Sequence, residues 1–234
     1  MKAKSILQNV VVAVAVVALS ACTTSRSRPN RWTRQTTHAP RLGLDGPRPE
    51  VLDLAVRAFD CGRAAGQFEG NVLTVIDYSL PSTERRLWVI DLDQGAVLFH
   101  EYVAHGQGSG DNYAFAFSNA PGSHQSSLGL FRTADTYWGR HGRSLRLAGL
   151  EWGVNDRAEE RAIVIHGAPY VSEGFVAEHG RLGRSWGCPA LPLGVHDAVI
   201  DRIRGGTAVF AYYPDPDWLA DSAFLRCDSR VARR

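Results

Sequence analysis

The stretch IVIHGAPYVSEGFVAEHGRLGRSWGCPALP, residues 163–192, decides how the chain is interpreted. It begins with an apolar run that ends in His166 and Gly167, which predicts a core strand with a histidine at its end. It closes on a polar, glycine-rich loop that holds Cys188. Such a surrounding, with Arg184 close by, favours an accessible thiol with a lowered pKa over an inert buried one.

A cysteine nucleophile needs a base, usually a histidine that a third group holds in place. The chain has eight histidines, and His166 stands out because a residue at the end of a core strand is rigidly held. His179 lies nearer to Cys188 in the sequence but in a polar loop, which makes it the weaker candidate. A strand-end histidine is also often a satisfied polar group of the core, so His166 taken alone does not establish catalysis.

Two other kinds of site find no support in the sequence. There is no His-Glu-x-x-His pattern and no closely spaced Cys/His set, so we expect no metal site. Lys2 and Lys4 are the only lysines among 26 basic residues, so that 24 arginines face 24 acidic residues in the rest of the chain. A neutral body argues against nucleic acid as the main partner.

The four cysteines divide into three groups. Cys22 follows the N-terminal apolar segment, Cys188 lies in the glycine-rich loop, and Cys61 and Cys227 lie near the two ends of the body. In an exported protein a pair of cysteines tends to form a disulfide, and joining Cys61 to Cys227 would tie those two ends together. The sequence leaves open whether they pair.

Residues 1–21 have the form of an export signal. Lys2 and Lys4 precede a largely apolar segment that is shorter than the ~20 residues of a transmembrane helix. The Leu-Ser-Ala-Cys sequence that follows resembles the bacterial lipobox, which implies cleavage after Ala21 and lipidation of Cys22. The alternative is an ordinary signal peptide with a chance cysteine.

Residues 22–49 are expected to form a flexible, arginine-rich tether behind the lipidated Cys22, because they show no hydrophobic period. The residue after Cys22 is not Asp, which resembles the sorting default of Gram-negative lipoproteins for the outer membrane. We therefore expect a lipid-anchored protein on the periplasmic face of that membrane.

Hydrophobic periodicity predicts one mainly β domain over residues 50–234. Apolar residues have helical spacing over 50–66 and again over 192–204. The segments that alternate with a period of two are 72–79, 85–93, 96–106, 161–168 and 206–214. Asp93 to Gly95 has the composition of a hairpin turn. Strands at this spacing predict a β-sandwich or barrel-like fold with a few flanking helices.

The opening stretch also resembles the catalytic domain of murein L,D-transpeptidases of the YkuD type, in the branch marked by GRLGRSWGCPA. The resemblance extends over about residues 70–215, through TVIDYSLPSTERRLWVIDL, VAHGQGSG, FSNAPGSHQSSLGLFRT and HGRSLRLAGLEWGVND. It implies an L,D-transpeptidase-like fold in which Cys188 is the nucleophile and His166 the base, oriented by the carbonyl of Gly167. It also implies an oxyanion site formed by Ser185 and the backbone around Gly187.

The resemblance implies a cysteine-dependent acyltransferase that acts on peptidoglycan stem peptides without a cofactor. The thiolate would attack a tetrapeptide stem, release D-Ala, and pass the acyl group from the thioester to an amine. Arg184 would steer a stem carboxylate or simply be an exposed loop arginine, and Tyr170 would line the cleft or pack in the core.

The chain also departs from the wider family. Trp186 and Pro189-Ala190 stand where other members carry a histidine and an apolar residue followed by Arg or Asn. The alternatives are an L,D-carboxypeptidase or endopeptidase that uses water, a catalytically silent peptidoglycan-binding lipoprotein, and transfer to a protein lysine. The sequence does not indicate an oligomeric state.

Overall fold

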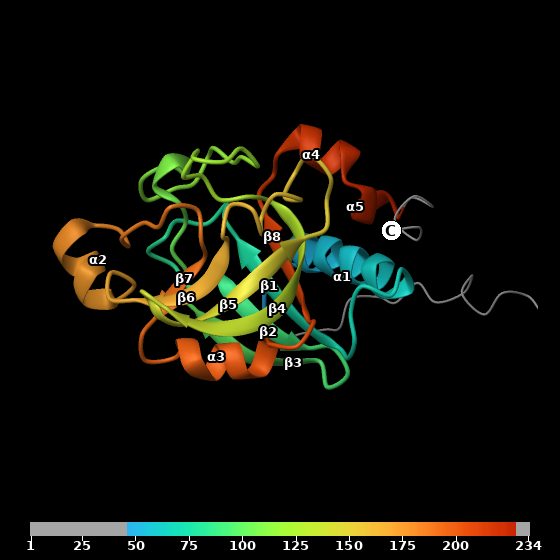
Figure 1. The fold of residues 1–234 in the computed structure, drawn as a ribbon, viewed down its shortest axis with the longest axis horizontal. Helices are drawn as coiled ribbons and strands as arrows, with labels where there is room; N and C mark the ends of the chain where they lie inside the picture. The colour runs from blue at the N-terminus through green and yellow to red at the C-terminus, as the bar shows by residue number, and fades with distance from the viewer. Residues whose placement is uncertain (1–45, 228–234) are drawn as a thin grey trace, which may run out of the picture. The chain divides into compact units, whose positions relative to one another are not determined.

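Eight strands in the order β3-β2-β1-β8-β4-β5-β6-β7 form one sheet in the computed structural model, which describes residues 46–227 (Figure 1). The strands are β1 (Val72–Asp77), β2 (Leu87–Asp91), β3 (Ala96–Glu101), β4 (Gly129–Gly139), β5 (Gly142–Gly149), β6 (Val164–Ala168), β7 (Ala190–Pro192) and β8 (Ala208–Tyr212). The predicted signal peptide (residues 1–21), Cys22 and nearly all of the predicted tether lie outside the described residues. Within residues 46–227 no helix is long and apolar enough to cross a membrane.

The two edges of this sheet meet, so the sheet is nearly closed into a barrel. Strands β3 and β7 are the two ends of the strand order. Ala104, just after β3, forms a bridge with Ala190 of β7, in which the Ala104 N–H donates to Ala190 O at 2.9 Å. Closure removes the exposed edges that invite aggregation. The prediction of a mainly β fold is confirmed. Of the two architectures predicted, a β-sandwich or a barrel-like fold, the structure shows the barrel-like one.

Most neighbouring strands run antiparallel, but β1–β8 and β6–β7 are parallel pairs. The hairpin from β2 to β3 turns where the sequence predicts it, and Gly95 adopts φ +60°, a conformation that glycine reaches without strain. The helices are α1 (Pro49–Ala64), α2 (Glu173–His179), α3 (His196–Ile203), α4 (Pro216–Asp221) and α5 (Ala223–Arg226), with a 3₁₀ turn at Gln107–Ser109. Helices α1 and α3 confirm the two helices that periodicity predicts.

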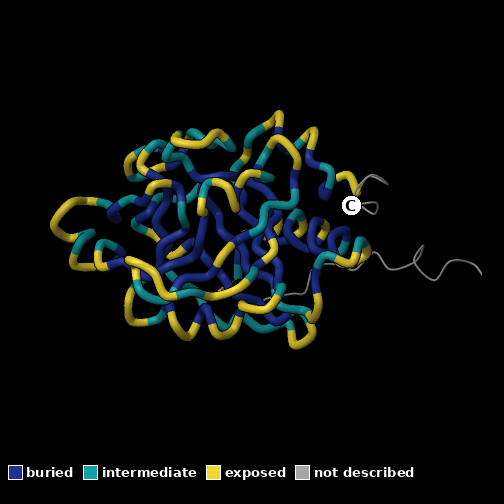
Figure 2. The backbone as a smooth tube through the Cα atoms, viewed as in Figure 1, coloured by how far each residue is buried: buried dark blue, intermediate teal, exposed yellow. Residues whose placement is uncertain are grey.

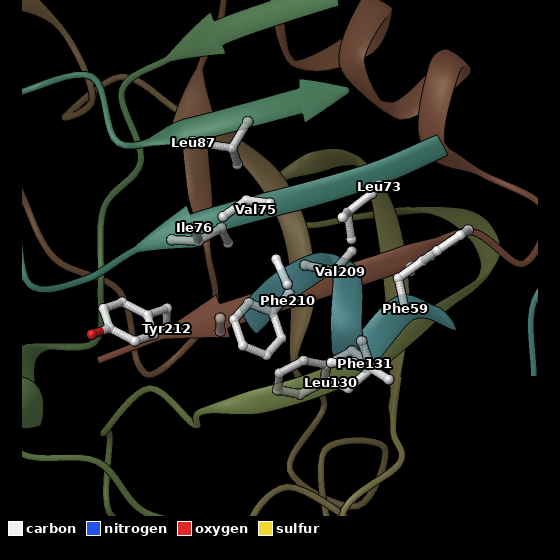
Figure 3. Packing of buried hydrophobic residues seen from close by; sticks show 14 of the residues in the cluster. Phe59, Leu73, Val75, Ile76, Leu87, Leu130, Phe131, Val209, Phe210 and Tyr212 are labelled. Atoms are coloured by element: carbon white, nitrogen blue, oxygen red, sulfur yellow. The ribbon is translucent and has the colours of Figure 1, made fainter. Parts of the chain in front are cut away.

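Helix α1 packs its apolar face against the sheet. Phe59 lies among Leu130, Phe131 and Val209 from strands β4 and β8 (Figure 3). Its ring also stacks on Phe68, with the centroids 5.8 Å apart. The buried backbone is concentrated in the strands and α1, whereas α2 has no buried residue and lies at the opposite end of the view from α1 (Figures 1 and 2).

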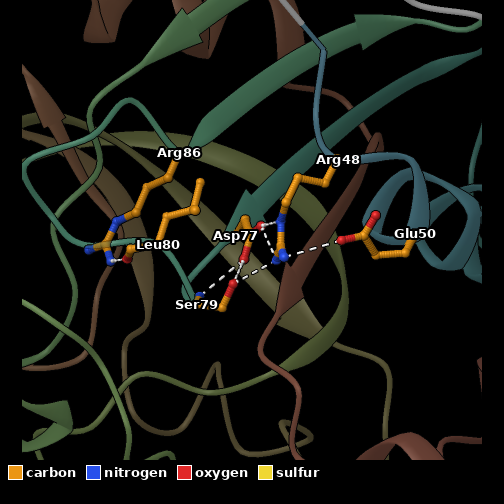
Figure 4. Close-up of polar contacts among 6 residues, drawn as sticks. All are labelled: Arg48, Glu50, Asp77, Ser79, Leu80 and Arg86. Atoms are coloured by element: carbon orange, nitrogen blue, oxygen red, sulfur yellow. Dashed lines mark hydrogen bonds and ion pairs between the residues drawn. The ribbon is translucent and has the colours of Figure 1, made fainter.

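One contact ties each end of the described chain to the body of the domain. Cys61 of α1 forms a disulfide with Cys227, which follows α5, and their Cα atoms are 5.4 Å apart. Arg48, which the sequence assigns to the tether, donates from Nη2 to Asp77 Oδ2 at 2.9 Å (Figure 4). The Asp77 side chain is completely buried at the end of β1, so the guanidinium supplies the partner that a buried carboxylate needs. Figure 4 also shows the guanidinium of Arg86, which donates to Leu80 O.

The β4–β5 hairpin was not predicted from periodicity. Its outer half is exposed, since Thr136, Trp138 and Gly139 of β4 contact solvent and only the inner half shows a buried pattern. A strand that is exposed on both faces loses the alternation by which strands are recognised.

Candidate active site

Strand β6 carries His166, and the short strand β7 brings Cys188 alongside it. His166 lies opposite Ala190, and its N–H donates to Pro189 O at 3.3 Å. Two residues earlier on β6, the Val164 N–H donates to Cys188 Sγ at 3.5 Å. The thiol therefore takes the place that a backbone carbonyl would take if β7 began earlier. The thiol is thus bound at Val164 of β6, and His166 lies two residues further along the same strand. Two residues of a strand span about 7 Å.

The neighbouring carbonyl fixes the orientation of the His166 ring. Nδ1 lies 3.0 Å from Gly167 O. A carbonyl only accepts, so Nδ1 carries the proton and Nε2 of the neutral ring keeps its lone pair. Gly167 can place its carbonyl there because it has no side chain: a Cβ would lie 2.7 Å from the His196 ring.

The surroundings of His166 keep its ring neutral. The residue is 3 % exposed, and burial lowers its pKa below the ordinary value. The bond to Gly167 raises the pKa, whereas the neighbouring histidines His141 and His196 lower it. His141 reaches the site from the tip of the β4–β5 hairpin, with its ring centroid 4.6 Å from that of His166. A buried neutral imidazole can accept a proton at neutral pH.

Cys188 is the free cysteine of the described chain, and it is half-buried. Burial raises the pKa of its thiol, while the Val164 N–H and the charge of Arg161 lower it. The expectation of a lowered pKa is therefore wrong, because loss of solvation outweighs the nearby positive charge. The resting residue is a thiol that must give up its proton to a base before it reacts.

Arg161 supplies the positive charge near Cys188, and it also holds the loop behind that residue. Its Nη1 donates to Ser118 O at 2.6 Å, and its Nη2 donates to Gln125 O at 2.5 Å. Nη2 would lie 3.3 Å from a Cβ on Gly187, so the guanidinium stands directly beside the residue before Cys188. No sequence pattern indicates Arg161, because its hydrogen-bond partners lie 34 to 43 residues away.

The loop of Cys188 is closed by hydrogen bonds of its own. Ser185 Oγ donates to Cys188 O at 2.6 Å and accepts from the Gly187 N–H at 3.0 Å. Gly187 has φ +117°, and a Cβ there would lie 2.8 Å from Gln125 O, so only glycine fits. In this structure Ser185 and Gly187 thus shape the turn that presents the thiol.

Two further residues that the sequence singles out have contacts of their own. Arg184 donates from Nη1 to Gly110 O at 2.9 Å and to Asp111 Oδ1 at 2.7 Å, so it ties two loops together. Tyr170 packs beside Ala168 and against Gly183. Burial, and then the negative charge that Cys188 can carry, raise the pKa of Tyr170 to about 12. Tyr170 therefore packs in a small apolar cluster and also interacts electrostatically with the nucleophile.

Within residues 46–227 no three His, Cys, Asp or Glu side chains are grouped closely enough to hold a metal ion. The thiol of Cys188 contacts the Val164 N–H and Ala162 O and feels the charge of Arg161, while His166 lies two residues beyond Val164 on β6. Cys188 and His166 together form a nucleophile with an oriented base, which is the arrangement used for acyl transfer.

The chain was compared with proteins of known structure and with known families. Thirty-six chains of known structure are similar to it. They include an L,D-transpeptidase from Mycobacterium smegmatis (16 % identity, TM-score 0.38, covering 61 % of this chain and 59 % of that one). Another is an L,D-transpeptidase from Stackebrandtia nassauensis (15 % identity, TM-score 0.37, covering 70 % and 67 %). A third is the helical cell shape determining protein of Campylobacter jejuni (13 % identity, TM-score 0.42, covering 66 % and 55 %).

The chain thus spans 59 % of the length of the Mycobacterium smegmatis chain. A search of curated proteins gave no match. A family model described as the L,D-transpeptidase catalytic domain matches residues 45–212, which include the whole sheet and the loop of Cys188. The chain therefore belongs to the L,D-transpeptidase catalytic domain family.

Proposed function

We propose that the protein is a peptidoglycan L,D-transpeptidase in which Cys188 forms a thioester with a tetrapeptide stem. One observation carries the proposal: Gly167 O binds His166 Nδ1 at 3.0 Å, which leaves the lone pair of Nε2 as a base beside the strand position of Cys188. Membership of the L,D-transpeptidase family supports the substrate class.

The first half of the reaction releases D-Ala. His166 Nε2 takes the thiol proton, and Cys188 Sγ attacks the carbonyl carbon that precedes D-Ala. The amide bond then breaks, the amine of D-Ala leaves with the proton from Nε2, and a thioester remains on Cys188. Because both residues rest in their neutral forms, this proton transfer is part of the barrier.

The second half transfers the acyl group. An amine of another stem attacks the thioester carbon, its proton passes to His166 Nε2, and the sulfur leaves as a thiol once that proton is returned. The oxyanion of both steps is assigned to the backbone around Gly187 and Cys188 and to Ser185. Ser185 must then exchange its bond to Cys188 O for one to the substrate.

Mass spectrometry of the reaction products tests this proposal. The full chain in detergent is incubated with disaccharide-tetrapeptide, and Cys188→Ala serves as the control. A cross-linked dimer that lacks one D-Ala, absent in the control, is expected. A tripeptide in place of the dimer would identify an L,D-carboxypeptidase. Unchanged substrate would contradict enzymatic function and favour a peptidoglycan-binding protein.

The predicted anchor belongs to the same proposal. A lipid on Cys22 and a tether that ends before Arg48, which is bound to Asp77, would hold the catalytic domain at the periplasmic face of the outer membrane, within reach of peptidoglycan. Intact mass of the purified chain tests this: we expect cleavage before Cys22 and a diacylglyceryl addition, both abolished in Cys22→Ser. A chain that starts elsewhere without lipid would contradict the anchor.

A further inference from the structure

An exposed tryptophan stands next to the nucleophile. Trp186 lies two residues before Cys188 and is 64 % exposed. Its ring stacks on that of His124, with the centroids 4.9 Å apart and the planes 9° from parallel. These two side chains are called the aromatic platform below. A large aromatic ring left in water forgoes the stability gained by burial, so packing of the fold does not account for its position.

The platform is fixed to the loops that hold Cys188. His124 Nδ1 lies 3.0 Å from Gln107 Nε2, and the Gln107 N–H donates to Ser185 O at 2.8 Å. Trp186 follows Ser185 directly and precedes Gly187, whose conformation is set by the turn described above. The indole is therefore held in one place relative to the thiol. A surface ordered before binding loses little entropy when a ligand covers it.

The occupant of the platform must be connected to the acyl group that reaches Cys188. In the proposed substrate, the stem peptide presents methyl, amide and charged groups, whereas the glycan presents pyranose rings with flat, apolar C–H faces. The sugar rings offer a flat apolar face that matches the indole, whereas a charged group of the stem, which also binds an indole face, is common to both donors compared below. We propose that the aromatic platform is a saccharide subsite, which receives a pyranose ring of the glycan that carries the stem. This inference rests on the proposed function.

The lengths involved agree with this assignment. Three stem residues lie between the sugar and the reacting carbonyl, and they span about 10 Å when extended. Trp186 and Cys188 are two residues apart, which limits their Cα separation to about 7 Å. One substrate can therefore contact both. The enzyme should then prefer a glycan-linked stem over the same stem without sugar.

Steady-state kinetics with two donors test the subsite. For the full chain, kcat/KM for D-Ala release is measured with disaccharide-tetrapeptide and with the free tetrapeptide. We expect the disaccharide form to be favoured by about tenfold, the size of one good aromatic contact. Trp186→Ala should lower that ratio to near one while the free tetrapeptide reacts as before. Trp186→Phe should retain part of the preference, and His124→Ala should weaken it.

Trp152→Ala is the matched control, because Trp152 is 76 % exposed and lies beyond the end of β5. It should leave the ratio unchanged. A wild-type ratio near one, or a ratio that survives Trp186→Ala, would overturn the subsite while leaving the proposed function intact. In the Cys22→Ser background, loss of binding to phospholipid vesicles on Trp186→Ala, with an unchanged ratio, would overturn the subsite and assign the platform to the membrane instead.

A binding measurement separates failure of the subsite from failure of the proposed function. If the wild-type protein turns over neither donor, calorimetry measures how disaccharide-tetrapeptide binds to two variants. These variants are Cys188→Ala and Cys188→Ala/Trp186→Ala. Binding that the second substitution weakens would support the subsite without catalysis. Equal binding by the two variants, or no binding by either, would overturn it. Thermal melts of each variant confirm that it is folded.

Discussion

His105 and His166 occupy similar places in the sequence, since each ends an apolar run and precedes a glycine. Both are buried, with 0 % and 3 % of their surfaces exposed. The difference lies in their ring nitrogens. Arg86 Nη2 donates to His105 Nδ1 at 2.7 Å, and His105 Nε2 faces Gly110 O at 3.4 Å. Both nitrogens of His105 are thus used within the fold.

His166 uses only Nδ1 in this way, and in the described part of the chain no hydrogen bond engages its Nε2. The pKa of His105 falls to about 3, mainly through burial and then through the charge of Arg86. The pKa of His166 is lowered as well, but the bond to Gly167 opposes the loss of solvation. The comparison shows that a histidine is available for catalysis when the fold leaves one nitrogen without a partner.

We expect the largest effects when each of the two histidines is replaced in turn. His166→Gln can still donate to Gly167 O but has no basic nitrogen, so kcat/KM for D-Ala release should fall roughly 100- to 10,000-fold with little change in Tm. His105→Gln should lower Tm and leave kcat of the folded protein nearly unchanged. Enzyme assays and thermal melts of both variants check this. The reverse result would show that the two roles have been exchanged.

Arg86 should be the more stabilising of two adjacent arginines. Its fully buried guanidinium donates to Val103 O, Leu80 O and His105 Nδ1. Arg86→Met leaves these acceptors unpaired and should cost about 3–5 kcal/mol in the free energy of unfolding. Arg85→Met is the control, because Arg85 pairs with Glu101 at the surface and should cost at most about 1 kcal/mol. Similar losses in urea unfolding of both variants would contradict this account.

The low pKa of His105 should make the fold sensitive to acid. In the folded protein the His105 ring stays unprotonated until the pH falls to about 3, its pKa there. In the unfolded chain the same ring takes up a proton near pH 6.5. Between these values the unfolded chain binds more protons, so stability falls as the pH falls. From pH 7 to pH 5 the histidine should cost about 2 kcal/mol. Urea unfolding of wild type and His105→Gln checks this, and an equal slope in both proteins would exclude His105 as the cause.

Arg161 should have the smallest effect, on thiol reactivity. Arg161→Met removes the charge that lowers the pKa of Cys188, so alkylation by iodoacetamide at pH 7 should slow by about three- to tenfold. Arg161→Lys keeps the positive charge but lacks the several N–H donors of the guanidinium, so it should restore part of the alkylation rate. Arg157→Met, in the same turn but exposed, is the control. An unchanged pH profile in Arg161→Met would show that Arg161 acts only as a loop clamp.

Periodicity predicted the strands whose faces are buried and the two helices α1 and α3. It missed α2, which has no buried residue, and the β4–β5 hairpin, in which the outer half of β4 is exposed and only the inner residues are buried. Hydrophobic alternation reports burial, and a segment that leaves the core loses that signal.

The site was predicted unevenly for a similar reason. Cys188 could be selected by its glycine-rich loop, and His166 by its strand and by the family resemblance. Strand position alone does not separate His166 from His105, because the difference rests on Arg86, which lies 19 residues from His105 and is brought against its ring by the fold. Arg161 was missed because only the fold brings it against residues 118–127.

The central claim is that Cys188 carries the acyl group and that His166 activates it. Intact-mass analysis of the full chain, quenched in acid at short times after mixing with disaccharide-tetrapeptide, tests it most directly. We predict a transient adduct with the mass of the donor less D-Ala, located on Cys188, absent in Cys188→Ala and formed at least 100-fold more slowly in His166→Gln. D-Ala release without an adduct, or an adduct that forms at the wild-type rate in His166→Gln, would contradict the account.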